Sequence, residues 1–371
     1  MTVGPVKIVT VLGTRPEIIR LSRIVPRLDR HVRQVLVDTG QNPDPALSDA
    51  FFAELGLRAP DHRLGIAERD FARQIGRILP AVREILLAER PDRFLVLGDT
   101  NSALSAIVAR RMNIPVFHLE AGNRCHDPRV PEEVNRRLVD QVSDVLLPYT
   151  ERSRQNLLRE GFPGERIHVV GNPIYEVLQA NAARADRSAV PAALGLEPGR
   201  YLLATLHRAE NTDDPARLAV FVAAFGAVAG QQGVPVVVST HPRTADRLAA
   251  AGIAAPPGVR FLPPFGFADF LALGRSARCV LTDSGTVQEE CAILRVPSVT
   301  LRDTTERPEA VEAGANIITG CDVAAILRCV AIACETSPAW HTPPEYLVPA
   351  VSETVLRIVA GALPPGVQAA S

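Results

Sequence analysis

Lysine is almost absent from this sequence: Lys7 is the only lysine among the 40 basic residues of a 371-residue chain. It lies inside the first apolar run, at residues 6–9, rather than behind a glycine-rich turn. A P-loop needs Gly-Lys-Ser/Thr after its strand, and a Schiff-base enzyme needs a lysine in a pocket. The sequence therefore argues against both classes.

The sequence also has no excess of positive or negative charge and no long apolar run. The formal net charge is -1, so no basic field is present to bind nucleic acid or an acidic membrane. The longest uncharged apolar stretch, 218–230, is about 13 residues, too short to cross a bilayer. With no signal-peptide pattern at the N-terminus, we expect a cytoplasmic protein without nucleic-acid or membrane partners.

Metal and thiol motifs are missing as well. The six cysteines contain no Cys-x-x-Cys pair, so they are expected to fill cores rather than form disulfides. Cys125 and Cys291 lie near polar motifs but have no partner base at a recognisable spacing. The histidines show no His-Glu-x-x-His or Cys/His spacing, and no metal site is expected.

What the sequence does contain is a regular alternation of short apolar strands and longer helical patterns. Such strands, with helices between them, are typical of parallel sheets covered on both faces. The expected strands are 6–12, 34–37, 94–97, 116–118 and 145–147, then 201–205, 234–239, 259–262, 279–282 and 298–301.

These two series predict an α/β protein of two Rossmann-like, doubly wound domains that face a cleft. A polar stretch at 184–200 separates the series. We expect residues 1–180, with a C-terminal helix at 350–363, to form the first domain, and 181–345 the second. Ligands of open α/β sheets bind beyond the carboxyl ends of the strands, so the cleft is the expected site.

Acidic side chains follow the expected strands of the first half. Residues 13–17 (Gly-Thr-Arg-Pro-Glu) form a turn into a helix start where N–H groups and Arg15 favour an anion; a plain turn with a surface arginine is the alternative. Asp99 and Glu120 each follow a strand, and Glu132 opens a helix after Pro131. Three carboxylates converging on one site suit acid–base chemistry.

The second half has cationic and hydroxyl groups at the same positions. His207 follows the strand at 201–205, and a Thr-His-Pro-Arg motif at 240–243 follows the next one. Residues 282–290 (Thr-Asp-Ser-Gly-Thr-Val-Gln-Glu-Glu) open a helix and predict a phosphate cradle, with Glu290 placed to accept from a ribose diol. Arg302 and Arg307 add positive charge.

Taken together, these motifs resemble the non-hydrolysing UDP-N-acetylglucosamine 2-epimerase family over nearly the whole chain. The motifs that carry the resemblance are 13–17, 40–41, 98–100, 120–122, 131–136, 207–211, 283–290 and 304–309. The resemblance implies two domains of the glycosyltransferase-B type, UDP held mainly by the second domain, and a homodimer.

The resemblance also implies roles for single residues. Asp99, Glu120 and Glu132 match the acid–base carboxylates, and His207 matches the histidine beside the sugar diphosphate. The positions that match substrate-binding and UDP-binding residues are Arg15, Arg20 (where the family usually has lysine), Arg136, Ser284, Gly285, Thr286, Glu290 and Arg307.

The implied reaction is the reversible epimerisation of UDP-N-acetylglucosamine at C2, by elimination of UDP to a 2-acetamidoglucal and re-addition. It needs no cofactor. Alternatives are a 2-epimerase of a modified UDP-sugar (a 6-deoxy sugar or a diacetamido-uronate) and a hydrolysing 2-epimerase that releases N-acetylmannosamine and UDP. A retaining glycosyltransferase would not need all three carboxylates, and a UDP-sugar sensor would bind without turnover.

Overall fold

The computed structural model describes residues 5–41, 45–68, 70–336 and 338–367, and its chain divides into two compact units. The first unit comprises residues 1–177 and 345–371, and the second comprises 178–344. The divide lies within helix α8 (Ile174–Asp186), so the polar stretch at 184–200 belongs to the second unit and contains the short helix α9 (Val190–Ala193).

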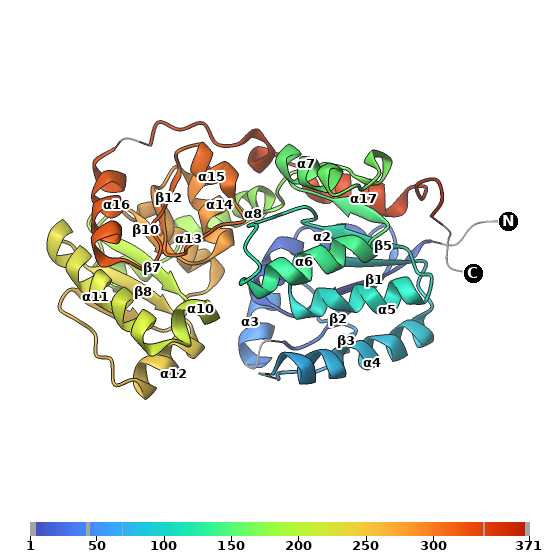
Figure 1. Cartoon of the computed structure of the whole chain (residues 1–371), viewed down its shortest axis with the longest axis horizontal. Coiled ribbons are helices and arrows are strands. Elements are labelled where there is room, and N and C mark those ends of the chain that lie inside the picture. Colours follow the sequence, from blue (N-terminus) through green and yellow to red (C-terminus); the bar gives the residue numbers. More distant parts are fainter. Residues whose placement is uncertain (1–4, 42–44, 69, 337, 368–371) are drawn as a thin grey trace. The chain divides into compact units, whose positions relative to one another are not determined.

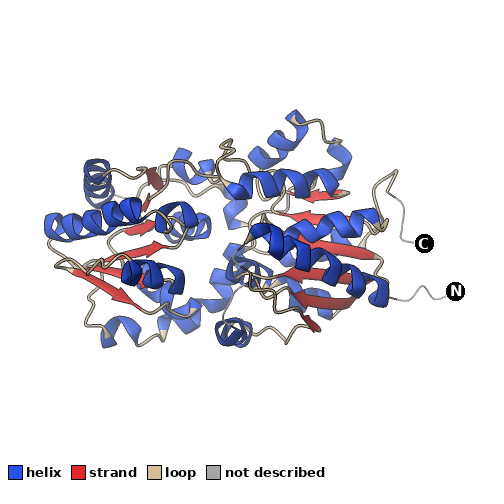
Figure 2. Cartoon of the chain, turned by 60° about the horizontal axis from the view of Figure 1, so that its bottom comes forward, coloured by secondary structure: helices blue, strands red, loops and turns tan. Residues whose placement is uncertain are grey.

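The first unit is built on a parallel six-stranded sheet in the order β3-β2-β1-β4-β5-β6, with helices on both faces (Figures 1 and 2). Its strands are β1 (Lys7–Leu12), β2 (Arg33–Asp38), β3 (His62–Arg63), β4 (Arg93–Leu97), β5 (Val116–Leu119) and β6 (Val145–Leu147). Its helices are α1 (Arg15–Leu21), α2 (Ile24–Asp29), α3 (Pro45–Glu54), α4 (Phe71–Glu89), α5 (Ala106–Arg111), α6 (Pro131–Val142), α7 (Glu151–Arg159) and α17 (Val351–Ala360), with 3-10 turns η1 (Asn101–Ser105) and η2 (Gly164–Arg166).

The second unit repeats this architecture with the strand order β12-β11-β10-β7-β8-β9, again all parallel. Its strands are β7 (Leu202–Leu206), β8 (Val236–Thr240), β9 (Val259–Leu262), β10 (Val280–Thr282), β11 (Ser298–Thr300) and β12 (Asn316–Ile318). Its helices are α10 (Ala209–Thr212), α11 (Pro215–Gln232), α12 (Pro242–Ala250), α13 (Phe267–Ser276), α14 (Gly285–Leu294), α15 (Pro308–Glu312) and α16 (Val323–Glu335); the 3-10 turn η3 (Pro344–Leu347) follows.

The two doubly wound sheets confirm the fold predicted from the sequence. All ten expected strands are present, with ends that differ by at most two residues. Each sheet has its own apolar core: Val9 and Val11 of β1 pack with Ile78 and Val82 of α4 in the first unit, and Val236 packs with α11 and α16 residues in the second. Burial of these strands on both faces explains their near-continuous apolar sequence.

The C-terminal helix α17 belongs to the first unit, where it packs against α2. The Arg93 guanidinium, at the start of β4, donates hydrogen bonds to the carbonyl oxygens of Val359 and, at 2.6 Å, Gly361. The Glu176 carboxylate accepts from the Ser352 backbone N–H (2.9 Å) and hydroxyl (2.6 Å). These contacts bind both ends of the helix to distant parts of the chain.

Glu17 is buried in the turn that follows β1. Its Oε2 accepts hydrogen bonds from the backbone N–H groups of Gly13 (3.0 Å) and Thr14 (2.8 Å). Its Oε1 accepts from the Thr100 hydroxyl at 2.9 Å, just beyond the end of β4. Burial raises the pKa of Glu17 to about 7, against the lowering effect of these hydrogen bonds. A carboxyl with a raised pKa therefore joins the ends of two neighbouring strands.

This raised pKa predicts how stability depends on pH. Because the folded chain holds the Glu17 proton more tightly than an unfolded glutamate of pKa 4.5, the stabilisation is present at acid pH and is lost as pH rises towards about 7. Glu17→Gln mimics the protonated carboxyl and has no proton to lose. We expect the wild-type chain to lose more thermal stability than the variant between about pH 5 and pH 8.

A matched control is Glu133→Gln. Burial acts to raise the pKa of Glu133, but the Cys125 N–H and the arginines beside it outweigh burial and lower it. Its stabilisation is therefore present at neutral pH and lost on acidification, which is the opposite sign. Melting temperatures with the same pH slope in the wild type and in Glu17→Gln would contradict the account of Glu17.

Candidate functional site

Asp99 lies immediately beyond β4, with its backbone and side chain both held by α6. The Arg136 guanidinium contacts Asp99 Oδ2 through Nη2 (2.5 Å) and Nε (3.1 Å). The side-chain amide of Asn135 donates to the Asp99 carbonyl oxygen at 3.0 Å. Arg136 is 1% exposed, whereas the Asp99 side chain is 23% exposed. The buried Arg136 guanidinium therefore holds the Asp99 carboxylate, which is partly exposed to solvent.

Glu120 occupies the equivalent position beyond the neighbouring strand β5. Arg20 of α1 forms an ion pair with Glu120 Oε2, and the Asn123 amide donates to Oε1 at 3.1 Å. A Cβ placed on Gly98 would lie 3.7 Å from Glu120 Oε2. The Glu120 carboxylate therefore lies near Gly98, the residue that precedes Asp99.

Helix α6 carries the third predicted carboxylate and its neighbour. Glu132 is half-buried in the first turn, one turn before Arg136 on the same face. Glu133 is buried: its Oε2 accepts from the Cys125 N–H (3.0 Å) and from Arg136 Nη1 (2.8 Å). Arg136 therefore bridges Glu133 and Asp99, a role that the residue types in the motif at 131–136 do not specify.

The turn at residues 13–17 differs from the anion site expected from the sequence. Glu17 itself accepts the N–H groups of Gly13 and Thr14, so these donors are occupied by the chain's own carboxyl. The Arg15 guanidinium lies over the Phe51 ring, 4.0 Å from its centroid. Arg15 is the residue of this turn that offers positive charge to a diphosphate.

In the second unit, Asp283 organises the loop that carries His207. Asp283 is fully buried; His207 Nδ1 lies 2.8 Å from its Oδ1, and its Oδ2 accepts from the backbone N–H groups of His207 and Arg208, both at 2.9 Å. Burial acts to raise the pKa of Asp283, but His207 and these N–H groups outweigh it and hold it well below the usual range. The His207 ring, 38% exposed, is thereby oriented by a buried carboxylate.

The start of α14 has the features of a phosphate cradle. Ser284 is the N-cap, and Gly285, Thr286 and Val287 follow in the first turn, where helix N–H groups lack intrahelical partners. A Cβ on Gly285 would lie 2.4 Å from Glu306 Oε1, so only glycine fits there without displacing that carboxylate. Glu306 is in turn held by Arg302 at 2.8 Å.

Glu290 and Arg307, both predicted to bind UDP, are buried near this helix. Arg307 forms an ion pair with Glu289, and a Cβ on Gly285 would lie 3.9 Å from the Arg307 guanidinium carbon. Glu290 is 6% exposed. The structure therefore places Ser284, Gly285 and Arg307 close together, with Glu290 further along the same helix.

Cys125 and Cys291 do not have the surroundings of nucleophiles. Burial raises the pKa of the Cys125 thiol, which lies 3.4 Å from Glu133 Oε2. Burial also raises the pKa of Cys291, and the nearby Glu290 adds to the effect. Both thiols are therefore held in their protonated, unreactive form.

Several residues of these sites were not identified from the sequence. Asn135 and Glu133 lie within the motif at 131–136, and Asn123 directly follows the motif at 120–122, but residue type alone does not indicate the contacts that they make with Asp99, Cys125 and Glu120. The described residues contain no cluster of histidine, cysteine, aspartate or glutamate able to hold a metal ion. Within the same ranges, no helix is both long and apolar enough to cross a membrane.

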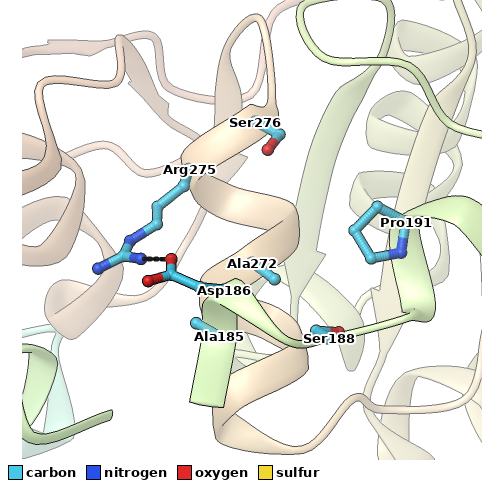
Figure 3. Close-up of a pocket in the computed structure, with 7 residues that line it drawn as sticks. All are labelled: Ala185, Asp186, Ser188, Pro191, Ala272, Arg275 and Ser276. Carbon is cyan, nitrogen blue, oxygen red and sulfur yellow. Dashed lines mark hydrogen bonds and ion pairs between the residues drawn. The ribbon is translucent and has the colours of Figure 1, made fainter. Parts of the chain in front are cut away.

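A further pocket lies in the second unit, between the end of α8 and α13 (Figure 3). Asp186 and Arg275 form an ion pair of 2.8 Å at its edge, and Ser188, Pro191 and Ser276 are among its other lining residues. None of the predicted site residues lines it. This pocket is therefore distinct from the strand-end residues described above.

Comparison with known proteins identifies the family to which the chain is similar. A family described as UDP-N-acetylglucosamine 2-epimerase matches residues 27–360. The chain is 38% identical over 346 residues to the UDP-N-acetylglucosamine 2-epimerase of Methanocaldococcus jannaschii, covering 91% of this chain and 94% of the relative. It is 40% identical over 319 residues to the UDP-2,3-diacetamido-2,3-dideoxy-D-glucuronate 2-epimerase of Pseudomonas aeruginosa, covering 85% and 88%.

The fold is likewise similar to a solved structure, that of Methanocaldococcus jannaschii UDP-GlcNAc 2-epimerase in complex with UDP-GlcNAc and UDP. The TM-score is 0.89 at 37% sequence identity, covering 95% of this chain and 99% of the other. These matches confirm the resemblance seen in the motifs. The chain belongs to the UDP-N-acetylglucosamine 2-epimerase family.

Proposed function

We propose that this chain converts UDP-N-acetylglucosamine reversibly to UDP-N-acetylmannosamine. The observation that carries the proposal is the pair Asp99 and Glu120: two carboxylates at adjacent strand ends, each ion-paired with a buried arginine. An epimerisation at carbon needs one group to remove a proton from one face and another to return it to the opposite face. Family membership supplies the substrate class.

The reaction begins at C1, because the C2 proton of an N-acetyl sugar is not flanked by a carbonyl. Breakage of the C1–O bond sends its electron pair to the UDP phosphate oxygen and leaves an oxocarbenium-like C1. The C2–H electrons then form a C1–C2 double bond as a carboxylate accepts the proton. The products are a 2-acetamidoglucal and UDP, and re-addition with a proton delivered to the other face gives the epimer.

The second unit binds and stabilises the departing UDP in this proposal. The backbone N–H groups after Ser284 can donate hydrogen bonds to an anion. Because they are already held in place by the helix, they need no reorientation when negative charge develops on the phosphate. His207, oriented by Asp283, and Arg15 of the first unit add hydrogen bonds and charge. Thr286, Arg307 and Glu290 complete the UDP-binding set, with Glu290 accepting from the ribose.

The first unit supplies the acid and base. Arg20 stabilises the charge of Glu120 and Arg136 that of Asp99, so both are available as bases, and each can return the proton that it took. Glu132, in the first turn of α6, is the third acid–base group of the proposal. No step requires a cofactor.

The substrate is proposed to carry no carboxylate at C6. Arg124 is buried and held by Asp140 (2.8 Å) and Glu160 (2.6 Å), and Arg129 pairs with Asp127 at 2.7 Å. These two are the only arginines between Glu120 and Pro131 in the sequence, and both are engaged by the chain's own carboxylates. We also propose that the enzyme is a homodimer, as the family resemblance implies, and that it acts in the cytoplasm, as expected from the sequence composition.

UDP binding gives the first prediction for this function. Replacing Glu290 with glutamine should weaken UDP affinity, because its ribose contact is made in the ground state and the transition state alike. Isothermal titration calorimetry of the full chain measures this directly. Asp186→Asn, at the separate pocket of the same unit, is the matched control and should bind UDP as the wild type does. Equal UDP affinity in Glu290→Gln and the wild type would remove Glu290 from the site.

The acid–base roles give the second prediction. Asp99→Asn, Glu120→Gln and Glu132→Gln should each lower turnover at least about 10²-fold, the usual scale for a positioned acid or base, while UDP binding persists. Asp127→Asn, a carboxylate of the neighbouring loop, is the control. In D₂O the wild type should place deuterium at C2. Epimerisation with no solvent deuterium at C2 would contradict the elimination route.

The choice of substrate gives the third prediction. In an NMR assay we would compare UDP-N-acetylglucosamine, its 2,3-diacetamido-glucuronate analogue and a 6-deoxy analogue. We expect only the first to be converted efficiently, because Arg124 and Arg129 are engaged by the chain's own carboxylates rather than by a C6 carboxylate. Conversion of the uronate, with UDP-N-acetylglucosamine left unchanged, would show that the substrate matches that of the Pseudomonas aeruginosa relative.

A further inference from the structure

A pocket of the first unit is lined by three arginines. Its volume is about 200 Å³, and Arg23, Arg27 and Arg30 line one side of it. Its other lining residues belong to α2, to the turn after α3, and to the first turns of α8 and α17. None of the acid–base or UDP-binding residues of the proposed function lines it. The pocket is therefore separate from the proposed catalytic site.

The three arginines lie on the same side of α2. Arg23 directly precedes the helix, Arg27 lies in its last turn and Arg30 directly follows it. Residues four and three positions apart are neighbours on a helix surface. Arg23 and Arg30 are exposed and Arg27 is half-buried, so all three side chains are accessible to a ligand. One short helix thus brings three guanidinium groups to one pocket.

These arginines have no carboxylate partner from their own helix. Asp29, the carboxylate of α2, is paired with Arg58 at 3.1 Å. Within the part of the chain that the structure describes, no hydrogen bond or ion pair engages the side chains of Arg23, Arg27 or Arg30. Like charges at this spacing destabilise a helix. The chain therefore gathers positive charge at the pocket without compensating it locally.

The lining contains one carboxylate, Glu176, and its oxygen atoms are engaged by α17. It accepts from the Ser352 backbone N–H at 2.9 Å and from the Ser352 hydroxyl at 2.6 Å. One negative and three positive side chains leave the lining with two excess positive charges. A phosphate monoester carries a charge of about -1.5 to -2 at pH 7 and would balance this excess.

We propose that this pocket binds a small phosphate-bearing anion through the guanidinium groups of Arg23, Arg27 and Arg30. A guanidinium offers several N–H donors in one plane and can bind two oxygen atoms of an anion at once. A carboxylate has two oxygen atoms, which one arginine can satisfy, whereas a phosphate ester presents three acceptor oxygens. Three arginines around one pocket therefore fit a phosphate better than a carboxylate.

The size of the pocket limits the rest of the ligand. Sites for drug-sized ligands have volumes of about 300–1,000 Å³. At about 200 Å³ this pocket is smaller, so it suits inorganic phosphate or a small phosphate ester rather than a whole nucleotide sugar. Pro26 and the buried Leu55 form apolar parts of its wall, against which the carbon skeleton of an ester can pack.

The pocket also lies beside the two places where the chain leaves and re-enters the first unit. The units divide after Val177 and again before Glu345, so Glu176 precedes one crossing and Ser352 follows the other. An anion held by α2 would add a third element to the contact between these two segments. Because it would bind the folded chain and not the unfolded one, it should raise the stability of the first unit.

Calorimetric titration of the full chain with inorganic phosphate, at constant ionic strength, tests the proposal. Saturating UDP is included so that the predicted phosphate cradle at the start of α14 is occupied. We expect Arg27→Gln to weaken phosphate binding at least about 10-fold, because hydrogen bonds between two charged groups are the strong ones. Arg30→Gln is the second variant if Arg27→Gln does not fold.

The matched control is Arg111→Gln, which removes an exposed arginine at the end of α5, outside the pocket. It should bind phosphate as the wild type does, and phosphate should raise its melting temperature as much. Equal phosphate affinity in Arg27→Gln and Arg111→Gln, or no saturable binding by the wild type, would overturn the proposal. If the chain bound no UDP, the proposed function would fail, while the contrast between the two variants would still decide this proposal.

Two further measurements identify the source of the phosphate and its position. Titration with glucose 6-phosphate that gives tighter, Arg27-dependent binding than inorganic phosphate indicates an ester; the reverse order indicates the free ion. Crystals of the full chain soaked in tungstate, a heavy analogue of phosphate, locate the anion by its anomalous signal. We expect a signal beside Arg23, Arg27 and Arg30, and tungstate bound only elsewhere would overturn the proposal.

Discussion

The ion pairing of carboxylates is the constraint on which the first unit depends. The proposed reaction needs more than one carboxylate within reach of one sugar carbon, and like charges placed together in a partly buried site repel one another. Here Arg20 is paired with Glu120 and Arg136 with both Asp99 and Glu133. Each guanidinium offers several donors in a fixed plane, so it sets the direction of the carboxylate as well as its charge.

Residues behind the site hold the loops that carry these carboxylates. The loops that carry Asp99 and Glu120 follow adjacent strands of a parallel sheet, and both turn through left-handed residues. Behind these turns, His118 contacts the Gly98 carbonyl oxygen at 2.9 Å and Asp140 at 2.8 Å. Asp140 accepts from the Gly122 N–H at 3.2 Å and pairs with Arg124, which also pairs with Glu160. In the second unit, Asp283 has a comparable task, because it fixes the His207 ring and the N–H groups of its loop. Buried charged side chains therefore set the positions of the charged side chains of the proposed site.

Much of the fold could be predicted from the sequence because parallel strands that are buried on both faces have a distinctive apolar pattern. The strands that were missed lack this pattern: β3 (His62–Arg63) has no apolar residue, and β12 (Asn316–Ile318) begins with asparagine. The strand ends then gave the candidate residues Asp99, Glu120 and His207. Their partners could not be predicted in this way: the Arg136–Asp99 pair joins residues 37 positions apart, and no spacing rule specifies it. In the turn at residues 13–17, the Glu17 carboxyl accepts the N–H groups of Gly13 and Thr14, a contact inside the motif that its residue types do not specify.

The central claim, reversible 2-epimerisation without release of the sugar, is tested most directly by approaching equilibrium from both sides. The full-length chain would be incubated with UDP-N-acetylglucosamine in one sample and with UDP-N-acetylmannosamine in another, and proton NMR would follow the anomeric signals. The account predicts that both samples reach the same ratio of the two UDP-sugars, with no accumulation of free N-acetylmannosamine. Stoichiometric release of N-acetylmannosamine and UDP, or no conversion in either direction, would contradict it.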